Sequence, residues 1–405
     1  MQHHFVTNLP PVYIGLLADL HKILDFDISV CYTVNGTSHI LSAERARRNG
    51  MKKTGKRINR AAIRVFSALF ALIFVFSAAG CGKSDEEKIR TAAYVDCFDT
   101  VSFIKGYADS GSEFDKYAEE FYGLLKYYNA LYDIYNLADE PNLKSLNDAA
   151  GGGAVTLSED IIELLEFSKE IYSLTGGKTN IALGSVLKIW HEYREKGIAD
   201  PENAALPSKE ELADAALHTD IENIIIDREN MTAEITDALC SIDVGAVAKG
   251  FAAEKIAKKL REDGFTNGII SIGGNTVAIG ERDGGGWKLG IRDPEKDDSS
   301  YIVKLALTDM SVVTSGSYQR FYSVDGKNYH HIIDPDTLMP AEGFASVSVV
   351  CGDSATADGL STALFCMSLE EGTAVVNSLD GVYVLWVTAD GEMIKSDGFD
   401  SFVSE

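Results

Sequence analysis

The sequence has no cysteines at metal-binding or redox spacing. Its 405 residues include six cysteines, and no two of them form the Cys-x-x-Cys pattern typical of zinc sites and thiol–disulfide centres. Cys351 and Cys366 lie in apolar runs, so we expect them to be buried as small hydrophobic side chains. A zinc module or a disulfide framework is therefore not expected.

Basic residues are also scarce. The chain carries 37 Lys and Arg against 61 Asp and Glu, a formal net charge of −24. Residues 1–80 hold 10 of the basic and 4 of the acidic residues. Residues 81–405 therefore keep 27 Lys and Arg against 57 Asp and Glu, a net charge of −30. A surface of this sign is unsuited to nucleic acid, because phosphate contacts need basic patches. It is also repelled by anionic lipid headgroups, so membrane attachment needs an anchor.

An anchor signal lies before residue 81. A basic segment precedes an apolar run of 15 residues, Val65 to Ala79, which is short for a spanning helix and typical of a signal-peptide core. The run leads to Ser77-Ala-Ala-Gly-Cys81, which resembles the lipidation box of bacterial lipoproteins. We therefore expect residues 51–80 to be a lipoprotein signal peptide, Cys81 to carry lipid, and residues 81–90 to form a tether. The protein would then be anchored at the bacterial cell membrane, facing outside the cytoplasm; an uncleaved membrane anchor is the alternative.

Fifty residues precede this signal, although secretion signals belong at the N-terminus. Met51 opens the basic segment, so we expect translation of the natural protein to start there and residues 1–50 to be a non-native upstream extension. No internal repeat, linker or low-complexity run divides residues 91–405, which are expected to form one domain.

The order of expected elements indicates an α+β fold. A single alternating strand is expected over residues 94–107, and many short strands from residue 221 onward. Helices are expected over residues 114–132, 157–174, 200–217, 357–367 and 369–379. Because a helical first half feeds a strand-rich second half, we expect the two to pack as one α+β domain and not as a regular βαβ repeat.

One strand–turn–helix segment is the first candidate for function. An acidic strand end, Ser241-Ile-Asp243, leads into a glycine turn and a helix that carries Lys249 in its first turn. Helix-start N–H groups and a cation both favour anions, so this place can hold a phosphorylated ligand. Taken alone, the pattern also fits an ordinary strand–turn–helix with capping charges. The helix prediction rests on four apolar residues near one face, Val247, Phe251, Ile256 and Leu260.

Three downstream clusters add candidate groups. Residues 314–320 form an expected polar turn that can cradle phosphate or be a plain loop. His330 and His331 stand beside an Asp-Pro turn; histidine suits proton transfer near neutral pH, and in strand alternation the two face opposite ways. Asp358 and Thr362 share one helix face, and their oxygens suit Mg²⁺. Each cluster also has a purely structural interpretation: a loop, an edge-strand histidine, or a helix-start Asp with an incidental Thr.

In this order, the clusters resemble the ApbE family, the FAD:protein FMN transferases, over about residues 91–400. Seven ordered motifs carry the resemblance: Phe98-Asp-Thr100, Asn180-Ile-Ala-Leu-Gly184 with Trp190, Ile242–Gly250, Ser271-Ile-Gly-Gly274, Thr314-Ser-Gly316, His331-Ile-Ile-Asp-Pro335 and Ala357–Thr362. The resemblance implies a single ApbE-like catalytic domain of the α+β class.

The resemblance also implies a set of site residues. Mg²⁺ would be bound by Asp358, Thr362 and the main-chain carbonyl of Ala246, and His331 matches the histidine thought to act as base. FAD would be lined by the side chains or backbone of Asp243, Lys249, Phe98, Tyr135, Lys178, Thr179, Asn180 and Ile333.

This chain departs from the family pattern at two places. Thr179-Asn180 stands where many members have Phe-Asp, which affects local FAD contacts, and Leu338 replaces Gly in the turn after Asp-Pro, which affects a loop shape.

The chemistry implied is transfer of FMN from FAD to a Ser or Thr hydroxyl of a partner protein, with release of AMP. Mg²⁺ and Lys249 would offset negative charge on the phosphoryl oxygens, and His331 would take the proton of the attacking hydroxyl. The implied acceptors are exported redox proteins, such as Rnf-type or extracellular electron-transfer subunits. The alternatives are an FAD pyrophosphatase, in which water replaces the acceptor, and a flavin-binding lipoprotein without chemistry. A two-lobed solute-binding lipoprotein is not expected, because regular α/β alternation is missing.

Overall fold

The structure is a computed structural model, and it describes residues 6–7, 30–34, 37–41, 89–296 and 300–404. The chain divides into two compact units, residues 1–66 and 67–405. The expected signal peptide and Cys81 lie outside the described residues. In the first unit, three strands pair in order, with the first two parallel and the last two antiparallel: β1 (Val6–Thr7), β2 (Val30–Val34) and β3 (Thr37–Leu41).

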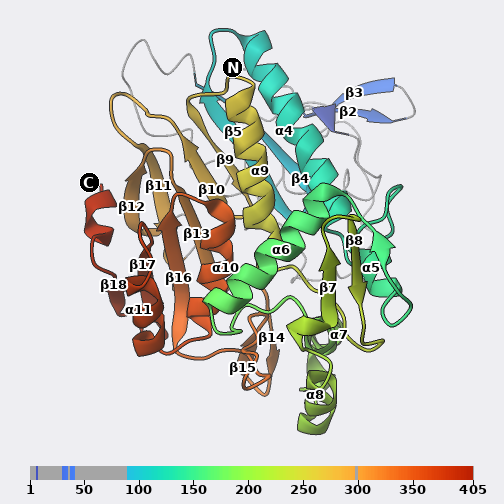
Figure 1. Cartoon of the computed structure of the whole chain (residues 1–405). Helices are drawn as coiled ribbons and strands as arrows, with labels where there is room; N and C mark the ends of the chain where they lie inside the picture. The colour runs from blue at the N-terminus through green and yellow to red at the C-terminus, as the bar shows by residue number, and fades with distance from the viewer. Residues whose placement is uncertain (1–5, 8–29, 35–36, 42–88, 297–299, 405) are drawn as a thin grey trace, which may run out of the picture. The chain divides into compact units, whose positions relative to one another are not determined.

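An eight-stranded antiparallel sheet forms the centre of the second unit (Figure 1). Its strand order is β18-β17-β16-β13-β10-β9-β5-β4. The strands are β4 (Ile89–Cys97), β5 (Thr100–Tyr107), β9 (Gly268–Ile272), β10 (Asn275–Ile279), β13 (Ser311–Gly316), β16 (Phe344–Cys351), β17 (Tyr383–Thr388) and β18 (Met393–Lys395). The sheet therefore joins two strands from the start of the unit to six from its second half, and the expected α+β class is confirmed.

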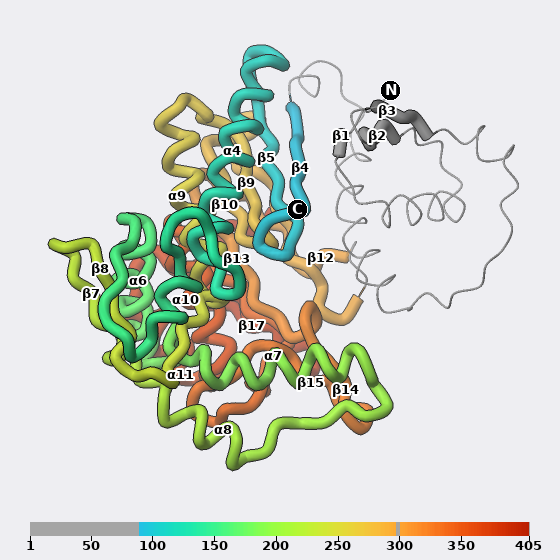
Figure 2. Tube along the Cα trace, turned by 90° about the vertical axis from the view of Figure 1, so that its right-hand side faces the viewer, coloured from blue at the N-terminus to red at the C-terminus, as the bar shows by residue number. Residues whose placement is uncertain are grey.

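Both faces of the sheet are covered (Figures 1 and 2). In β9, Ile270 packs into the helical core whereas its neighbour Ile269 packs into the core of a hairpin on the other side. That hairpin is β11 (Trp287–Arg292) with β12 (Tyr301–Leu307), and the 3-10 turn Phe399–Phe402 adds apolar side chains to the same core. The helices of the first face are α4 (Gly111–Leu131), α6 (Glu159–Leu174), α9 (Ala248–Glu262), α10 (Ser354–Phe365) and α11 (Leu369–Asn377).

Smaller elements complete the unit. The hairpin β14 (Phe321–Val324)–β15 (Lys327–His330) packs against α7 (Gly184–Ala199) and shares a small core with it. The others are α5 (Leu143–Asp148), α8 (Lys209–Ala216), the 3-10 turns Pro201–Asn203 and Ile221–Asn223, and a three-stranded sheet of β6 (Val155–Thr156), β8 (Thr232–Ile235) and β7 (Ile224–Asp227). None of the described helices is long and apolar enough to cross a bilayer.

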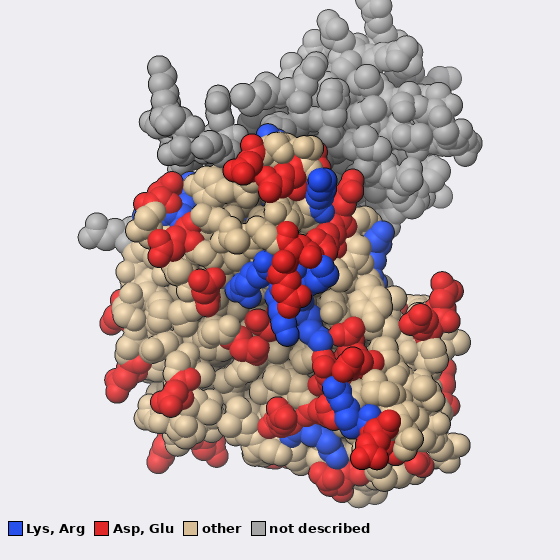
Figure 3. Space-filling model, turned by 45° about the horizontal axis from the view of Figure 1, so that its top comes forward, with Lys and Arg blue, Asp and Glu red and all other residues tan. Residues whose placement is uncertain are grey.

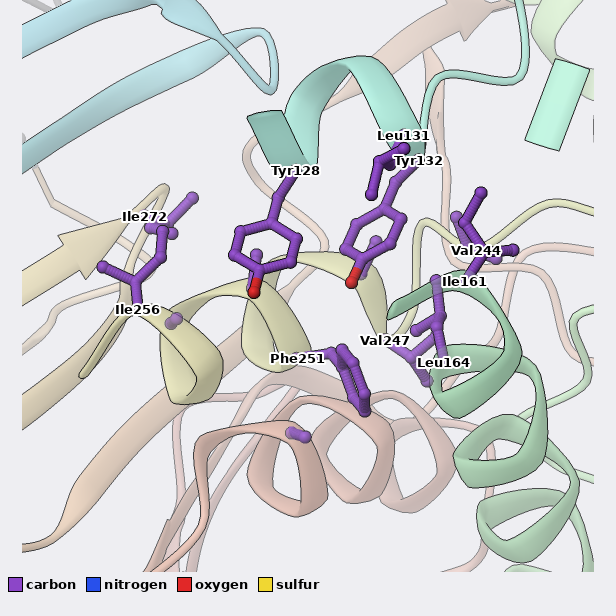
Figure 4. Packing of buried hydrophobic residues seen from close by; sticks show 14 of the residues in the cluster. Tyr128, Leu131, Tyr132, Ile161, Leu164, Val244, Val247, Phe251, Ile256 and Ile272 are labelled. Atoms are coloured by element: carbon purple, nitrogen blue, oxygen red, sulfur yellow. The ribbon is translucent and has the colours of Figure 1, made fainter. Parts of the chain in front are cut away.

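The expected apolar face of α9 is confirmed by the packing. Its side chains enter the core shared with α4, α6 and the sheet, where Phe251 lies among rings and branched side chains (Figure 4). Tyr132, the residue that caps the end of α4, meets Phe251 edge-on, with ring centroids 6.4 Å apart. All four residues of the predicted face are buried: Val247, Phe251, Ile256 and Leu260.

Charged side chains of both signs alternate on the surface outside these helices (Figure 3). Lys255 of α9 pairs with Asp160 of α6 at 3.0 Å, and Lys259 pairs with Glu120 of α4 at 3.2 Å. These two basic residues therefore form ion pairs that tie neighbouring helices together. Such exposed pairs contribute little each, about 0–1 kcal/mol.

One expected strand is in fact two. Residues 94–107 alternate in the sequence, but β4 and β5 form a hairpin in which Cys97 pairs with Thr100. The turn residues Phe98 and Asp99 have positive φ, 55° and 49°. Tight hairpin turns of this kind are usually marked by Asn-Gly or Asp-Gly, and Phe-Asp carries no such signal. The prediction of a single strand is therefore wrong.

Three other boundaries differ from expectation. Thr314–Gly316 completes β13, so the first part of the expected polar turn is strand. The helix expected over 200–217 begins only at Lys209. The strand expected around the two histidines ends at His330, and His331 lies in the following loop. Cys351 and Cys366 are buried free thiols, as expected.

A close helix contact lies between α9 and α10 at Gly250. A Cβ added to Gly250 would lie 2.4 Å from the Asp358 Cβ and 2.4 Å from the Ser354 carbonyl oxygen. Neither group is the flexible end of a side chain, so any larger residue would push the helices apart.

Gly250→Ala should therefore lower the free energy of unfolding by about 1–3 kcal/mol, the usual cost of overpacking. Gly123→Ala is the matched control, because Gly123 lies within α4 with nothing within 4 Å of an added Cβ. There, the same change should raise the free energy of unfolding by about 0.5–1 kcal/mol through the lower entropy of the unfolded chain. Chemical denaturation measures both, and equal effects of the two substitutions would contradict the close contact.

Candidate active site

The start of α9 departs from regular helix bonding. The Gly250 N–H donates to Asp358 Oδ2 at 2.7 Å. In a regular helix this N–H would bond the carbonyl four residues earlier, that of Ala246. Across the described part of the chain, no hydrogen bond to the Ala246 carbonyl is found. The contact with Asp358 thus leaves a backbone oxygen free at the position for which the sequence predicts a metal ligand.

Asp358 is a buried carboxylate, 4% exposed, on α10. Burial raises its pKa, and the charge of Lys249 and the Gly250 hydrogen bond act in the opposite direction. Within the described residues it has no ion-pair partner, and buried charges normally require one or a metal. Asn275 lies near enough to lower this pKa, and its buried amide nitrogen makes no hydrogen bond of normal geometry. The carboxylate is therefore a charge that the chain itself does not neutralise.

Thr362 lies one turn after Asp358 on α10 and is only partly buried. Its Oγ1 is 3.4 Å from the Ser315 hydroxyl, which also lies 2.8 Å from Ser361 Oγ. Carboxylate, hydroxyl and carbonyl oxygens are the donors that Mg²⁺ prefers. No cluster of three or more His, Cys, Asp or Glu side chains arranged for a metal occurs among the described residues. A site at Asp358 would thus rely on one carboxylate and neutral oxygens.

Asp243 closes the turn that leads into α9. Its Oδ1 accepts the Gly245 N–H at 2.8 Å, and its own N–H donates to the Ile181 carbonyl at 2.8 Å. Burial raises its pKa, whereas the Gly245 bond and the charges of His191, Lys249 and Arg194 lower it. The bond to Ile181 brings the predicted 180–184 and 242–250 motifs side by side.

Lys249 bends back over the same turn. Its Nζ donates to the Gly245 carbonyl at 3.1 Å. Its charge acts on Asp243, Asp358 and His331, and it forms no ion pair within the described residues. One cation therefore influences both acidic groups and the predicted base.

His331 has the arrangement of a neutral base. Its Nδ1 lies 3.2 Å from the Arg320 carbonyl, which also accepts the His331 N–H at 3.1 Å. A carbonyl only accepts, so Nδ1 carries the proton and Nε2 keeps its lone pair. Burial, followed by the charges of Arg320, His330, Lys249 and Arg194, lowers the pKa of His331 to about 3. The ring is thus uncharged near neutral pH.

His330 has a different role from its neighbour. Its Nε2 lies 2.8 Å from the Ala341 carbonyl and its Nδ1 accepts the Ile332 N–H at 3.2 Å. Both ring nitrogens are therefore used within the loop, and its ring meets Phe365 edge-on at 5.6 Å. That only one of the pair faces the site stays a prediction, and the end of β15 at His330, not strand alternation, separates the two rings.

Two predicted aromatic residues border the charged groups. Tyr135 is 60% exposed, and its ring lies 5.7 Å from that of His191. Its pKa is raised by burial and Asp243 and lowered by Arg194 and Arg320, which places it among the charges of the site. Phe98 lies at the β4–β5 turn, where its N–H donates to Asn129 Oδ1 at 2.6 Å. The exposed ring of Tyr135 can stack on a planar ligand ring.

In the predicted segment 178–180, all three side chains bond to other groups of the protein. Lys178 Nζ pairs with Asp334 and Asp336, each at 2.8 Å. The Thr179 hydroxyl donates to the Gly359 carbonyl at 2.7 Å, and Asn180 Nδ2 donates to the Thr219 carbonyl at 2.9 Å. These contacts fasten the segment to α10 and to the loop after His331, so its backbone is what it can offer a ligand.

Two further residues belong to that loop. Ile333 is buried and forms a bridge with Pro340. Leu338, where the family pattern has glycine, has a φ of 60°, which costs a non-glycine residue about 1–2 kcal/mol. Its carbonyl accepts the Trp190 indole N–H at 2.9 Å, so the loop keeps its turn and is tied to α7.

Sequence reasoning missed several groups at the site. Ser315 lies inside a predicted motif, and its polar character could have marked it. Arg194 and His191 follow Trp190 on α7 without any distinctive spacing, and Asn275 opens β10 among apolar residues. Their importance follows from contacts between distant segments, which no local pattern contains.

Comparison with known proteins agrees with this architecture. The ApbE family model matches residues 98–386. A FAD:protein FMN transferase from Treponema pallidum (strain Nichols) is 33% identical over 276 residues, covering 64% of this chain and 74% of that protein. One from Klebsiella pneumoniae (strain 342) is 30% identical over 280 residues, covering 69% and 84%.

Solved structures show the same fold. The ApbE protein of Thermotoga maritima has a TM-score of 0.68 and 29% identity, covering 78% of this chain and all of that one (100%). The flavin transferase ApbE from Vibrio cholerae has a TM-score of 0.65 and 25% identity, covering 78% and 99%. Since the family model spans well over half of its residues, the chain belongs to the ApbE family and is an enzyme of the transferase class.

Proposed function

We propose that this chain is a FAD:protein FMN transferase, which moves FMN from FAD to a Ser or Thr hydroxyl of another protein and releases AMP. The observation that carries the proposal is that the start of α9 presents two oxygen donors together. The buried Asp358 carboxylate accepts the Gly250 N–H, and the Ala246 carbonyl is thereby left without a hydrogen bond among the described residues. The names of the relatives, each a FAD:protein FMN transferase, support the same reaction.

The Ala246 carbonyl, Asp358 and Thr362 would hold Mg²⁺. Bound there, it would supply positive charge against the phosphoryl oxygens and the leaving AMP. The donors fit, because all are oxygens and because the carboxylate lacks an ion-pair partner among the described residues. Lys249 would add a second positive charge, held in place by the Gly245 carbonyl.

His331 would accept the proton of the attacking hydroxyl at Nε2. The Arg320 carbonyl holds the proton on Nδ1, so the free lone pair faces away from that bond. The new bond joins the acceptor oxygen to the FMN phosphorus, and the bond that breaks joins this phosphorus to the oxygen of AMP. Burial first and the neighbouring cations second lower the pKa of His331 to about 3. A bound diphosphate would offset the charge of these cations and so raise the pKa toward the range useful for a base.

Mass spectrometry of an acceptor tests this function directly. Residues 82–405, incubated with FAD, Mg²⁺ and exported redox proteins of Rnf or extracellular electron-transfer type, should add FMN to one Ser or Thr and release AMP. Free FMN and AMP without protein modification would instead show that the protein is a pyrophosphatase. Unchanged FAD would show that the protein binds flavin without catalysing a reaction.

His331→Gln should lower the rate of FMN transfer by roughly 10²–10⁴-fold in this assay, because a general base is lost. His330→Gln is the matched control, since both of its ring nitrogens are used within the loop. Equal losses in the two variants would argue against His331 as the base.

Asp358→Asn tests the magnesium site. Because burial raises the pKa of Asp358, folding is favoured as the pH falls through that pKa, and the ionised form destabilises the metal-free protein at neutral pH. The amide, of similar shape, should leave the Tm in chelator unchanged or higher. Mg²⁺ should raise the Tm of the wild type but not of the variant, and transfer should fall by about 10²–10³-fold.

Asp380→Asn, at an exposed position between α11 and β17, is the control. It should keep both the Mg²⁺-dependent rise in Tm and the transfer activity. A rise in Tm of Asp358→Asn equal to that of the control would rule out Asp358 as a ligand.

The enzyme would act outside the cytoplasm, tethered to the bacterial membrane by lipid on Cys81. The sequence before this cysteine and the acidic charge of residues 81–405 support an anchor of this kind. Mass spectrometry of the protein from bacterial membranes should find a lipidated Cys81 at its N-terminus, and Cys81→Ser should release the protein into the soluble fraction. An unmodified Cys81, or peptides from residues 1–50 in the mature protein, would contradict this arrangement.

A further inference from the structure

Arg194 is a partly buried cation without a close carboxylate. Its side chain is 17% exposed, and within the described residues its nearest ion-pair partner is Glu195, at 4.0 Å on the surface. One guanidinium nitrogen instead donates to His191 Nδ1 at 2.7 Å. Burial, followed by the charge of Arg320, lowers the pKa of Arg194, although an arginine stays protonated. The chain therefore keeps a positive charge partly away from water without neutralising it.

Arg320 lies near Arg194 because α7 and β14 pack closely. A Cβ added to Gly197 of α7 would lie 2.6 Å from the ring of Tyr322, two residues after Arg320. The Arg320 guanidinium reaches only the Asp99 carbonyl, at 3.4 Å, and has no ion pair in the described parts of the chain. Two positively charged arginine side chains from separate parts of the chain therefore lie in the same region.

The groups around this region are those of the proposed reaction site. Arg194 and Arg320 both influence Tyr135 and His331, and Lys249 also influences His331. Asp243 and Asp99 are the acidic groups that face the same residues, and neither forms an ion pair with the arginines. Like charges held together in this way repel unless an anion joins them.

We propose that Arg194 is a substrate-binding residue which, with Arg320 at its side, binds a phosphate group of a diphosphate-bridged dinucleotide. The inference rests on the proposed function and extends it to residues outside the predicted motifs. The planar guanidinium fork matches phosphate oxygens, and charge-assisted hydrogen bonds of this kind are the strong ones. His191 positions Arg194, because its Nδ1 accepts one guanidinium hydrogen and leaves the others for the ligand.

A small phosphate is favoured over an acidic segment of the acceptor protein. Arg194 is mostly covered by its neighbours, so a phosphate can reach it where a folded protein surface would need that cover to move. Tyr135, exposed beside His191, offers a ring face for the planar part of the same ligand.

Binding measurements with three flavins test the proposal. Arg194→Gln in the folded chain of residues 82–405 should weaken FAD binding by about 10- to 100-fold, the range for a lost hydrogen bond to a charged group. It should leave the affinity for riboflavin, which has no phosphate, unchanged, with FMN between the two. Arg194→Lys should recover part of the loss, and higher salt should weaken FAD binding more in the wild type than in Arg194→Gln.

Lys196→Gln is the matched control. This substitution removes the same charge from the same helix, but at a side chain that is 73% exposed. It should bind FAD as the wild type does. Equal FAD affinities of wild type and Arg194→Gln would overturn the proposal, as would an equal loss for riboflavin, which would indicate a disturbed fold. A raised KM for the acceptor with unchanged FAD affinity would assign Arg194 to the protein partner and overturn it as well.

The two proposals fail separately. If the wild type binds FAD but modifies no acceptor, and Arg194→Gln still loses FAD affinity selectively, the phosphate site stands and the transferase function falls. If the wild type transfers FMN and Arg194→Gln binds FAD normally, the function stands and the phosphate site falls.

Discussion

The candidate active site depends on the close approach of α9 and α10 at Gly250. Because glycine has no Cβ, the Asp358 backbone comes near enough for its carboxylate to accept the Gly250 N–H. That hydrogen bond replaces the one that would normally occupy the Ala246 carbonyl. A single packing contact therefore produces two oxygen donors at once, and it holds the carboxylate where burial makes its charge costly without a cation.

The two helices of this contact belong to two hydrophobic cores. One packs α9 against α4, α6 and one half of the sheet, and the other packs α10 and α11 against β13, β16 and β17. The site lies between them, where helix starts, strand ends and loops supply polar groups. Rigid surroundings of this kind keep the distances between catalytic groups fixed, which electrostatic catalysis requires.

The charge of the site is opposite in sign to that of the protein. Residues 81–405 are strongly acidic, and much of their basic charge is used in surface ion pairs. Around His331, by contrast, Lys249, Arg194 and Arg320 lack such partners among the described residues, apart from a distant contact to Glu195. A cationic centre in an acidic protein favours an anionic ligand there and not elsewhere on the surface. Burial, together with these cations, keeps His331 neutral before the ligand arrives.

The sequence by itself determined the fold class, the buried face of α9 and the family, because hydrophobic periodicity and ordered motifs are local properties. It also pointed to Asp358, Thr362 and the two histidines, whose spacing follows from one helix or one loop. Only the tertiary structure decided that His331 keeps a free nitrogen, that Lys178 is held in ion pairs, and that Arg194 lies near enough for its charge to act on His331. Each of these depends on a contact between segments far apart in the chain, and no pattern within one segment specifies which partner a side chain will meet.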